Sequence, residues 1–104
     1  MTTRLSTFPK TQLVIVTEAV LEKPLLREAR ERGAQSWSVS DVRGAWHEGE
    51  RSGDWEAERS IEIKLVCDAS VAEALAEHVL TTYAPNYSVT ISLSTVSVLR
   101  PERF

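Results

Sequence analysis

The sequence contains little of what several common activities require, beginning with cysteine. Its single cysteine, Cys67, excludes an intramolecular disulfide and any paired-cysteine metal or redox motif. Basic residues number 12 against 15 acidic ones, and a net charge of −3 argues against non-specific binding to nucleic acid or anionic membranes. The longest uniformly apolar run covers only residues 13–16, far short of the roughly 20 that a membrane helix needs. Because the N-terminus also lacks a basic-then-apolar signal pattern, we expect a cytoplasmic protein.

Motifs typical of catalysis and of nucleotide hydrolysis are missing as well. There is no Walker or GxGxxG pattern and no HExxH, and residues 60–67 lack the aromatic side chains of an RNA-recognition strand. A serine triad built on His47 and Asp54 has no supporting spacing, and no residue offers an obvious general base. We therefore expect a protein without enzymatic activity, with Cys67 in the core and His78 as a partly buried structural histidine.

Apolar periodicity divides the 104 residues into two similar halves, each of which reads as a strand, a helix and a strand. We expect a flexible tail over residues 1–9 and one domain over residues 10–104. Within the domain we expect strands over 10–17, 35–42, 61–67 and 87–99, and helices over 20–32 and 71–83. Gly33 is placed for a left-handed cap after the first helix, and Ser70 with Glu73 forms a capping-box pattern before the second.

Right-handed crossovers in both halves predict an α+β, ferredoxin-like βαββαβ fold with a four-stranded antiparallel sheet. The first and third strands are expected in the centre, with both helices on one face. Five valines are expected on the other face: Val14, Val16, Val66, Val96 and Val98. The phase change that places the last two there implies a bulge in the last strand or burial that switches sides. A closed oligomer would bury these uncovered faces against one another.

Residues 43–59 form a long loop between the second and third predicted strands. The loop contains three of the four glycines, two of the three tryptophans and one of the two histidines. Loops beyond about 12–15 residues are commonly functional. Trp46 and Trp55 are expected to contact a ligand, a neighbouring subunit or their own domain, because an exposed indole forgoes ~4–6 kcal/mol of burial. This composition favours a binding loop.

Arginines at two places in the sequence are candidates for binding an anion. They lie in or beside the loop and near the C-terminus: Arg43, Arg51, Arg59, Arg100 and Arg103. The planar guanidinium fork suits phosphate and carboxylate oxygens, and Gly44 would let a backbone N–H approach such a ligand closely. The alternative is a set of surface arginines paired with the loop carboxylates Glu48, Asp54, Glu56 and Glu58.

The segment V-S-D-V-R-G at residues 39–44 resembles the V-T-E-V-K-G that leads into the T-loop of PII signalling proteins, at the same place in the same order of strands and helices. The resemblance covers residues 10–104. The loop pattern G-x-W-E/D-x-x-R-x-I at residues 53–61 and the ending V-L-R-P-E-R-F are similar to the carboxysome-associated PII-like class. The chain departs from PII proteins in three ways: A-W-H replaces part of their G-F-G-R-Q, the loop has no tyrosine, and residues 83–87 are no long glycine-rich loop for a triphosphate.

The resemblance implies a homotrimeric sensor that binds ADP or AMP in the clefts between subunits, with bicarbonate as a second effector. By position it implies that Ser38 approaches the adenine pocket. Arg43 and Gly44, at the base of the T-loop-like segment, are implied to lie near the nucleotide, and Arg100 to reach its phosphates. The missing triphosphate loop argues against ATP sensing of the PII kind.

Further assignments come from chemistry rather than from a matched motif. Arg103 joins the nucleotide site, and Arg51 and Arg59 are assigned to bicarbonate or another anion. In this hypothesis the ligands set the conformation of the 43–59 loop by their difference in affinity for its states. The loop then reports to an unidentified partner protein in inorganic-carbon (carboxysome) metabolism.

A trimeric divalent-metal-binding protein of the cation-tolerance type is the alternative, because it uses the same fold and assembly. Its ligands would have to come from Cys67, His78 and His47 with the loop carboxylates, such as Glu48 and Glu50. A buried Cys67 leaves few good ligands for this reading.

Overall fold

The computed structural model of the chain describes residues 4–46, 49–51 and 59–104. The strands are β1 (Phe8–Glu18), β2 (Trp37–Val42), β3 (Gly44–Trp46), β4 (Gly49–Arg51), β5 (Ser60–Cys67) and β6 (Val89–Val98). The helices are α1 (Glu22–Glu31) and α2 (Ala69–Thr82), with short 3-10 turns at η1 (Ala19–Leu21) and η3 (Pro101–Arg103). None of the helices in these described ranges is long and apolar enough to cross a membrane.

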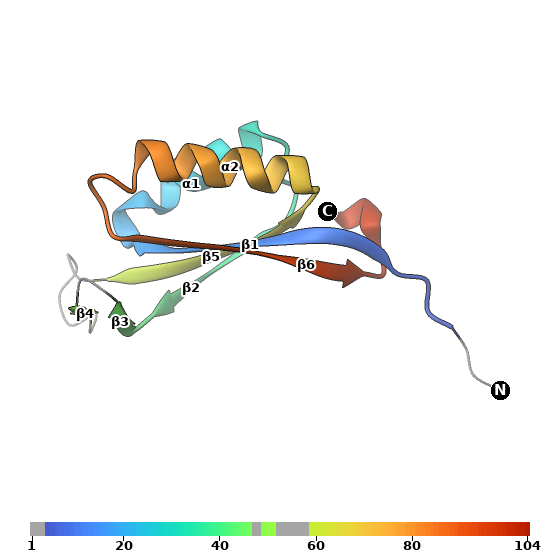
Figure 1. Cartoon of the computed structure of the whole chain (residues 1–104), viewed down its shortest axis with the longest axis horizontal. Helices are drawn as coiled ribbons and strands as arrows, with labels where there is room; N and C mark the ends of the chain where they lie inside the picture. The colour runs from blue at the N-terminus through green and yellow to red at the C-terminus, as the bar shows by residue number, and fades with distance from the viewer. Residues whose placement is uncertain (1–3, 47–48, 52–58) are drawn as a thin grey trace.

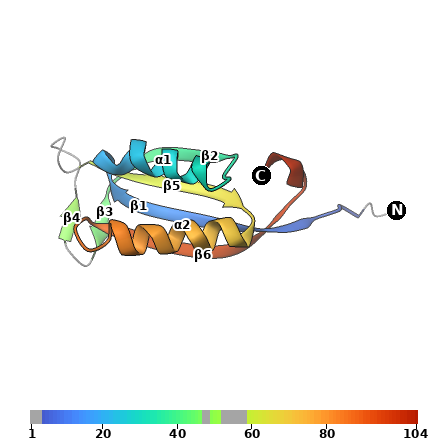
Figure 2. The same cartoon turned by 90° about the horizontal axis from the view of Figure 1, so that it is seen from above.

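Four strands form one antiparallel sheet in the order β2-β5-β1-β6, so the first and third predicted strands are central. Both helices lie on the same face of this sheet (Figure 1), and from above they run side by side across it (Figure 2). The predicted ferredoxin-like fold is therefore confirmed. The sequence did not predict the small antiparallel ribbon of β3 and β4, which begins directly after Arg43.

The core fills the space between the sheet and the two helices. Alternate residues of β1 and β5 point toward the helices, as the strand period of two requires, and each helix contributes one apolar stripe. The largest fully buried side chains are Leu13, Ile15, Leu25, Ile61, Ile63, Leu65, Leu75 and Val79. Cys67 lies in this core as predicted, and burial raises the pKa of its thiol above the ordinary value. A buried, protonated thiol is a poor nucleophile and a poor metal ligand.

The chain leaves α1 through a left-handed glycine. Gly33 has a φ of 101°, which residues with a side chain rarely adopt. Its N–H donates to the Arg30 carbonyl at 3.0 Å, and the Ala34 N–H donates to the Ala29 carbonyl at 3.0 Å, the two bonds of a Schellman cap. The predicted cap is therefore confirmed, and it returns the chain toward β2 with Ala34 buried in the core.

The start of α2 differs from the prediction. Its N-cap residue is Asp68, with φ −64° and ψ 148°, so the helix begins at Ala69 and Ser70 already lies in the first turn. The capping box proposed for Ser70 and Glu73 is therefore wrong. The Asp68 side chain makes no capping bond either, and its Oδ1 instead accepts a hydrogen bond from Lys10 Nζ at 2.6 Å. Lys10 of β1 thus binds the Asp68 carboxylate, which the local sequence alone would predict as a side-chain cap of α2.

β6 pairs with β1 one residue at a time from Val89 to Val98, without a bulge. The phase change in its sequence therefore reflects burial that switches sides. Val89 and Ile91 pack against the helix-side core. Val96 and Val98 belong to the opposite alternation and point to the other face of the sheet.

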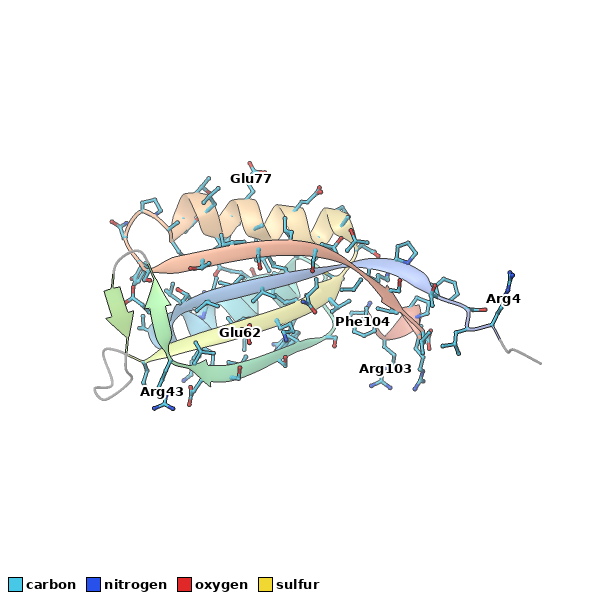
Figure 3. The ribbon with its side chains drawn as sticks, turned by 60° about the horizontal axis from the view of Figure 1, so that its bottom comes forward. Arg4, Arg43, Glu62, Glu77, Arg103 and Phe104 are labelled. Atoms are coloured by element: carbon cyan, nitrogen blue, oxygen red, sulfur yellow. The ribbon has the colours of Figure 1, made fainter. Side chains whose placement is uncertain are left out.

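Figure 3 views the face of the sheet away from the helices, where Glu62 is labelled, and strand alternation places the predicted valines on this face. Val14 and Val16 are half-buried there, between the core residues of β1. Lys64 and Glu62 share this face, because they pair with Val14 and Val16 respectively across β5 and β1. Val66, also half-buried, continues the same row. This face, which the helices leave uncovered, is the reason to expect the closed oligomer, which stays a prediction.

Several connections meet at the end of β1. Thr17 Oγ1 donates to the Ser88 carbonyl at 2.8 Å, and the Ser88 N–H donates to Glu18 Oε2 at 2.8 Å. The Ala19 N–H donates to the Arg59 carbonyl at 3.0 Å. These bonds fasten both the turn before β6 and the residue before β5 to the corner where β1 passes into the first helix.

Candidate functional site

Strand pairing fixes the base of the 43–59 loop. Val42, the last residue of β2, pairs with Ser60, the first residue of β5. Beyond this pair, Gly44 lies opposite Arg51 across the β3-β4 ribbon, which brings two predicted ligand residues together at the level of the backbone. Arg43 is exposed at the junction between the sheet and the ribbon (Figure 3).

Arg59 joins the two strands that enter and leave the loop. Its Nη2 donates to Asp41 Oδ1 at 2.8 Å, while its backbone carbonyl accepts from Ala19. The Asp41 side chain is 74% exposed and the Arg59 side chain 37%. An ion pair this exposed contributes about 0.2–1 kcal/mol, so water and salt compete with it readily. The loop carboxylates were the partners considered from the sequence, and Asp41 was missed.

Ser38, predicted for the adenine pocket, is exposed on the outer strand β2. It pairs with Lys64 of β5, and both therefore stand on the face away from the helices. The sequence alone does not link Lys64 to Ser38. The strand register supplies that link, and it makes Lys64 a further candidate cation beside the predicted adenine site.

Arg100 and Arg103 follow β6 and are both exposed. The Arg103 N–H donates to the Arg100 carbonyl at 3.0 Å, which closes the short turn η3 around Pro101. Arg100 Nε lies 3.3 Å from Glu102 Oε1, and both side chains are largely in water. The turn therefore brings the backbones of two exposed arginines together after β6.

The two sets of arginines lie at opposite ends of the sheet. Ser60, at the loop base, pairs with Glu18 at the end of β1, whereas Val98, just before Arg100, pairs with Phe8 at its start. β1 is 11 residues long, a span of roughly 30–35 Å at about 3.3 Å per residue. Figure 3 shows Arg43 and Arg103 toward opposite ends of the sheet. A single chain therefore does not bring the predicted nucleotide residues together.

A polar cluster joins the two helices on their side of the sheet. Glu28 of α1 accepts a hydrogen bond from Tyr83 OH at 2.6 Å and also contacts His78 Nε2 of α2. His78 Nδ1 lies 3.3 Å from Thr82 Oγ1. Partial burial raises the pKa of Glu28, but hydrogen bonds from Tyr83 and His78 and the charge of His78 outweigh it and hold that pKa below its ordinary value. Burial and the Glu28 carboxylate raise the pKa of Tyr83 to about 12.

This cluster confirms His78 as a partly buried structural histidine. Within the described ranges, no group of three or more histidine, cysteine or acidic side chains is arranged to hold a metal ion. His47, Glu48, Asp54, Trp55, Glu56 and Glu58 lie outside those ranges, so the interpretations placed on them, including the metal alternative, draw on residues that the structure does not describe.

Residues 10–103 match the family model described as Nitrogen regulatory protein P-II, and the chain belongs to that family. Members of the P-II family are signalling proteins and not enzymes, in agreement with the missing catalytic motifs. None of the curated proteins compared with the chain matches it significantly.

Solved structures share this fold over nearly the whole chain. A PII-like signalling protein from Thermus thermophilus is 29% identical, with a TM-score of 0.82, over 96% of this chain and 99% of its own. CPII from Thiomonas intermedia, bound to ADP and bicarbonate, is 17% identical, with a TM-score of 0.87, over 97% and 99%. The same protein bound to ADP, AMP and bicarbonate is 17% identical, with a TM-score of 0.86, over 97% of this chain and 98% of its own. Identities of 17% establish likeness of fold alone.

Proposed function

We propose that this chain is a regulatory PII-like protein that forms a homotrimer and binds ADP or AMP in the clefts between subunits. Bicarbonate is its second effector, and the 43–59 loop signals to a partner protein in inorganic-carbon metabolism of the carboxysome type. The observation that carries the proposal is the separation of the two arginine sets by the length of β1. Residues suited to one phosphorylated ligand stand at opposite ends of a chain whose sheet has an uncovered face.

Assembly into an oligomer would account both for the separated arginine sets and for the uncovered face of the sheet. A ring of copies that turns the uncovered faces inward buries the valine rows and sets the end of one sheet beside a neighbouring sheet. Arg100 and Arg103 of one copy then face Arg43 and Gly44 of the next. The nucleotide site in this proposal exists only in the oligomer, with the phosphates between the two arginine sets and the adenine near Ser38.

The turn after α2 supports a nucleotide shorter than a triphosphate. The N–H groups of Asn86 and Tyr87 both donate to the Tyr83 carbonyl, at 3.0 and 2.9 Å. This tight turn commits its backbone donors internally and contains no glycine. Its N–H groups are therefore not arranged to cradle phosphates, and the charge of ADP or AMP falls to the arginines.

The assignment of bicarbonate is supported by the ligands of CPII, which is bound to ADP and bicarbonate in one structure and to ADP, AMP and bicarbonate in another. Bicarbonate is a planar oxyanion, which a guanidinium fork can engage through two parallel hydrogen bonds. Arg59, at the base of the loop, and Arg51, opposite Gly44 in the β3-β4 ribbon, are proposed for that role.

Isothermal calorimetry with ADP, AMP, ATP and bicarbonate, together with sedimentation equilibrium of the free protein, tests the proposal. We expect a mass of three chains, heat with ADP and AMP, and a bicarbonate response that is stronger when nucleotide is present. The absence of heat with every adenine nucleotide at millimolar concentration would overturn it. Adenosine serves as the control ligand, because it offers the base and ribose without phosphates.

A further inference from the structure

The guanidinium of Arg59 already holds a carboxylate. Asp41 Oδ1 accepts a hydrogen bond from its Nη2 at 2.8 Å. A carboxylate and bicarbonate present the same planar pair of oxygens to an arginine, so the two compete for one fork. A small oxyanion that takes the N–H of Arg59 now bonded to Asp41 must displace that carboxylate.

We propose that Asp41 is a built-in competitor of the oxyanion ligand at the loop base. Its carboxylate occupies the Arg59 guanidinium when ligand is absent and thereby sets the concentration at which bicarbonate engages that arginine. The inference rests on the proposed function, because it concerns the regulation of the same site. It adds a residue that sets affinity, Asp41, to which the sequence analysis assigns no ligand role.

Backbone geometry keeps the two partners in reach of each other. Asp41 pairs with Ile61 across β2 and β5, and Arg59 is tied through its carbonyl to the Ala19 N–H at 3.0 Å. Both backbones are thus held by the sheet and by the corner after β1. Exchange of Asp41 for an external anion therefore requires only side-chain rotation.

Exposure makes the exchange easy. Because the Asp41 side chain is 74% exposed, its released carboxylate is hydrated without a burial cost. Exposed ion pairs shift an equilibrium by a factor of roughly 1.5 to 5. Asp41 accordingly weakens oxyanion binding by a factor of this size, enough to move a threshold without abolishing the response.

Another exposed pair of the molecule provides the control. Arg27 Nε and Glu31 Oε1 lie 4.0 Å apart on α1, with side chains 65% and 62% exposed. Glu31→Gln removes one negative charge and one arginine partner, as Asp41→Asn does, but on the helix face. The two variants have the same net charge, so any difference between them arises from position.

The experiment titrates bicarbonate into the full-length protein saturated with ADP, at about pH 8 and constant ionic strength, with heat as the readout. Acetate serves as a second planar oxyanion. We expect Asp41→Asn to bind bicarbonate and acetate about 1.5- to 5-fold more tightly than wild type, with ADP affinity unchanged. Glu31→Gln should match wild type. Arg59→Lys should lose the acetate response, because lysine cannot reproduce the planar fork.

Unchanged or weaker oxyanion binding by Asp41→Asn, in a protein that keeps its circular dichroism and ADP affinity, would overturn the inference. Wild type could bind ADP but give no heat with bicarbonate. In that case, heat from bicarbonate with Asp41→Asn alone supports the competitor role of Asp41, and no heat with either protein contradicts that role. Failure of wild type to bind any adenine nucleotide is a different result. That outcome contradicts the proposed function itself, and the nucleotide titration detects it before any variant is made.

Discussion

Leu65 and Val66 are neighbours in β5, yet the two faces of the sheet on which they stand are built differently. The face of Leu65 is completed within one chain, because α1 and α2 cover it and leave that side chain only 1% exposed. The face of Val66 combines half-buried valines with Glu62 and Lys64, and the chain's own helices do not cover it. The first face is organised to make a domain, and the second carries apolar and charged side chains that the chain's own helices leave uncovered.

The largest effect is expected from a charge on the uncovered face. Val16→Asp would place a carboxylate opposite Glu62 of β5. In the proposed trimer this charge is buried without a partner, which costs about 3–5 kcal/mol per subunit. We expect a single-chain mass by sedimentation and loss of ADP binding, with the circular dichroism of the fold retained.

Leu80→Asp is the control for that variant, since Leu80 is 60% exposed on α2 and lies on the other side of the sheet. It should leave both the mass and ADP binding unchanged. A Val16→Asp protein that still sediments as the oligomer would show that the uncovered face is not the subunit interface.

The second largest effect is expected from shortening a side chain on the covered face of the sheet. Leu65→Ala removes a buried side chain from the core and should lower the free energy of unfolding by about 2–5 kcal/mol. Val66→Ala, one residue along, should cost about 1 kcal/mol or less within the chain, because its side chain is only half-buried. Urea denaturation in the single-chain Val16→Asp background compares them without the burial between copies, and equal losses would contradict the division between the two faces.

Arg100→Ala tests the phosphate end of the proposed site. A hydrogen bond to a charged phosphate contributes about 1.5–3 kcal/mol, so ADP should bind roughly 10- to 100-fold more weakly. Adenosine, which lacks phosphates, should bind as it does to wild type. Calorimetry with both ligands decides the matter, and equal losses for the two would remove Arg100 from the phosphate contact.

The smallest effect concerns the cluster between the helices and its dependence on pH. The pKa of Tyr83 is raised from 10 to about 12, so its contribution to stability is complete below pH 10 and is lost as the pH rises through 12. Tyr83→Phe should therefore lower the free energy of unfolding by about 1 kcal/mol at neutral pH. The difference from wild type should shrink toward pH 12, as measured by urea denaturation along the pH series.

The pKa of Glu28 is shifted in the opposite direction from that of Tyr83. Its folded pKa lies below the unfolded value near 4.5, so its contribution is present above that pH and is lost as the pH falls through the folded pKa. Glu28→Gln should accordingly differ most from wild type near neutral pH and converge with it in acid. Glu77→Gln, an exposed position of α2, should show no such convergence.

Much of the fold could be predicted from the sequence, because the apolar periods of its strands and helices are long and regular. The left-handed cap at Gly33 was equally predictable. The capping box at Ser70 failed because Asp68, two residues earlier, caps the helix through its backbone, while its side chain bonds to Lys10 on another strand. The β3-β4 ribbon was missed because strands of three residues have no period to detect.

The candidate site was less accessible to sequence reasoning for a geometric reason. Residue types that suit an anion were identified, but their positions in space depend on strand order and register. That Arg43 and Arg100 lie at opposite ends of the sheet follows from the pairing of Ser60 and Val98 with opposite ends of β1. The partner of Arg59 was hidden in the same way, since the loop offers several carboxylates closer in sequence than Asp41.

The corner at the end of β1 also matters for protein engineering. The hydrogen bond between Ala19 and Arg59 and those of Thr17 and Glu18 with Ser88 fasten the scaffold beside the loop base. We expect the segment between Arg43 and Arg59 to tolerate replacement by an unrelated sequence, a dye-labelled peptide or a small inserted domain. The scaffold would then serve as a carrier onto which new recognition loops can be grafted.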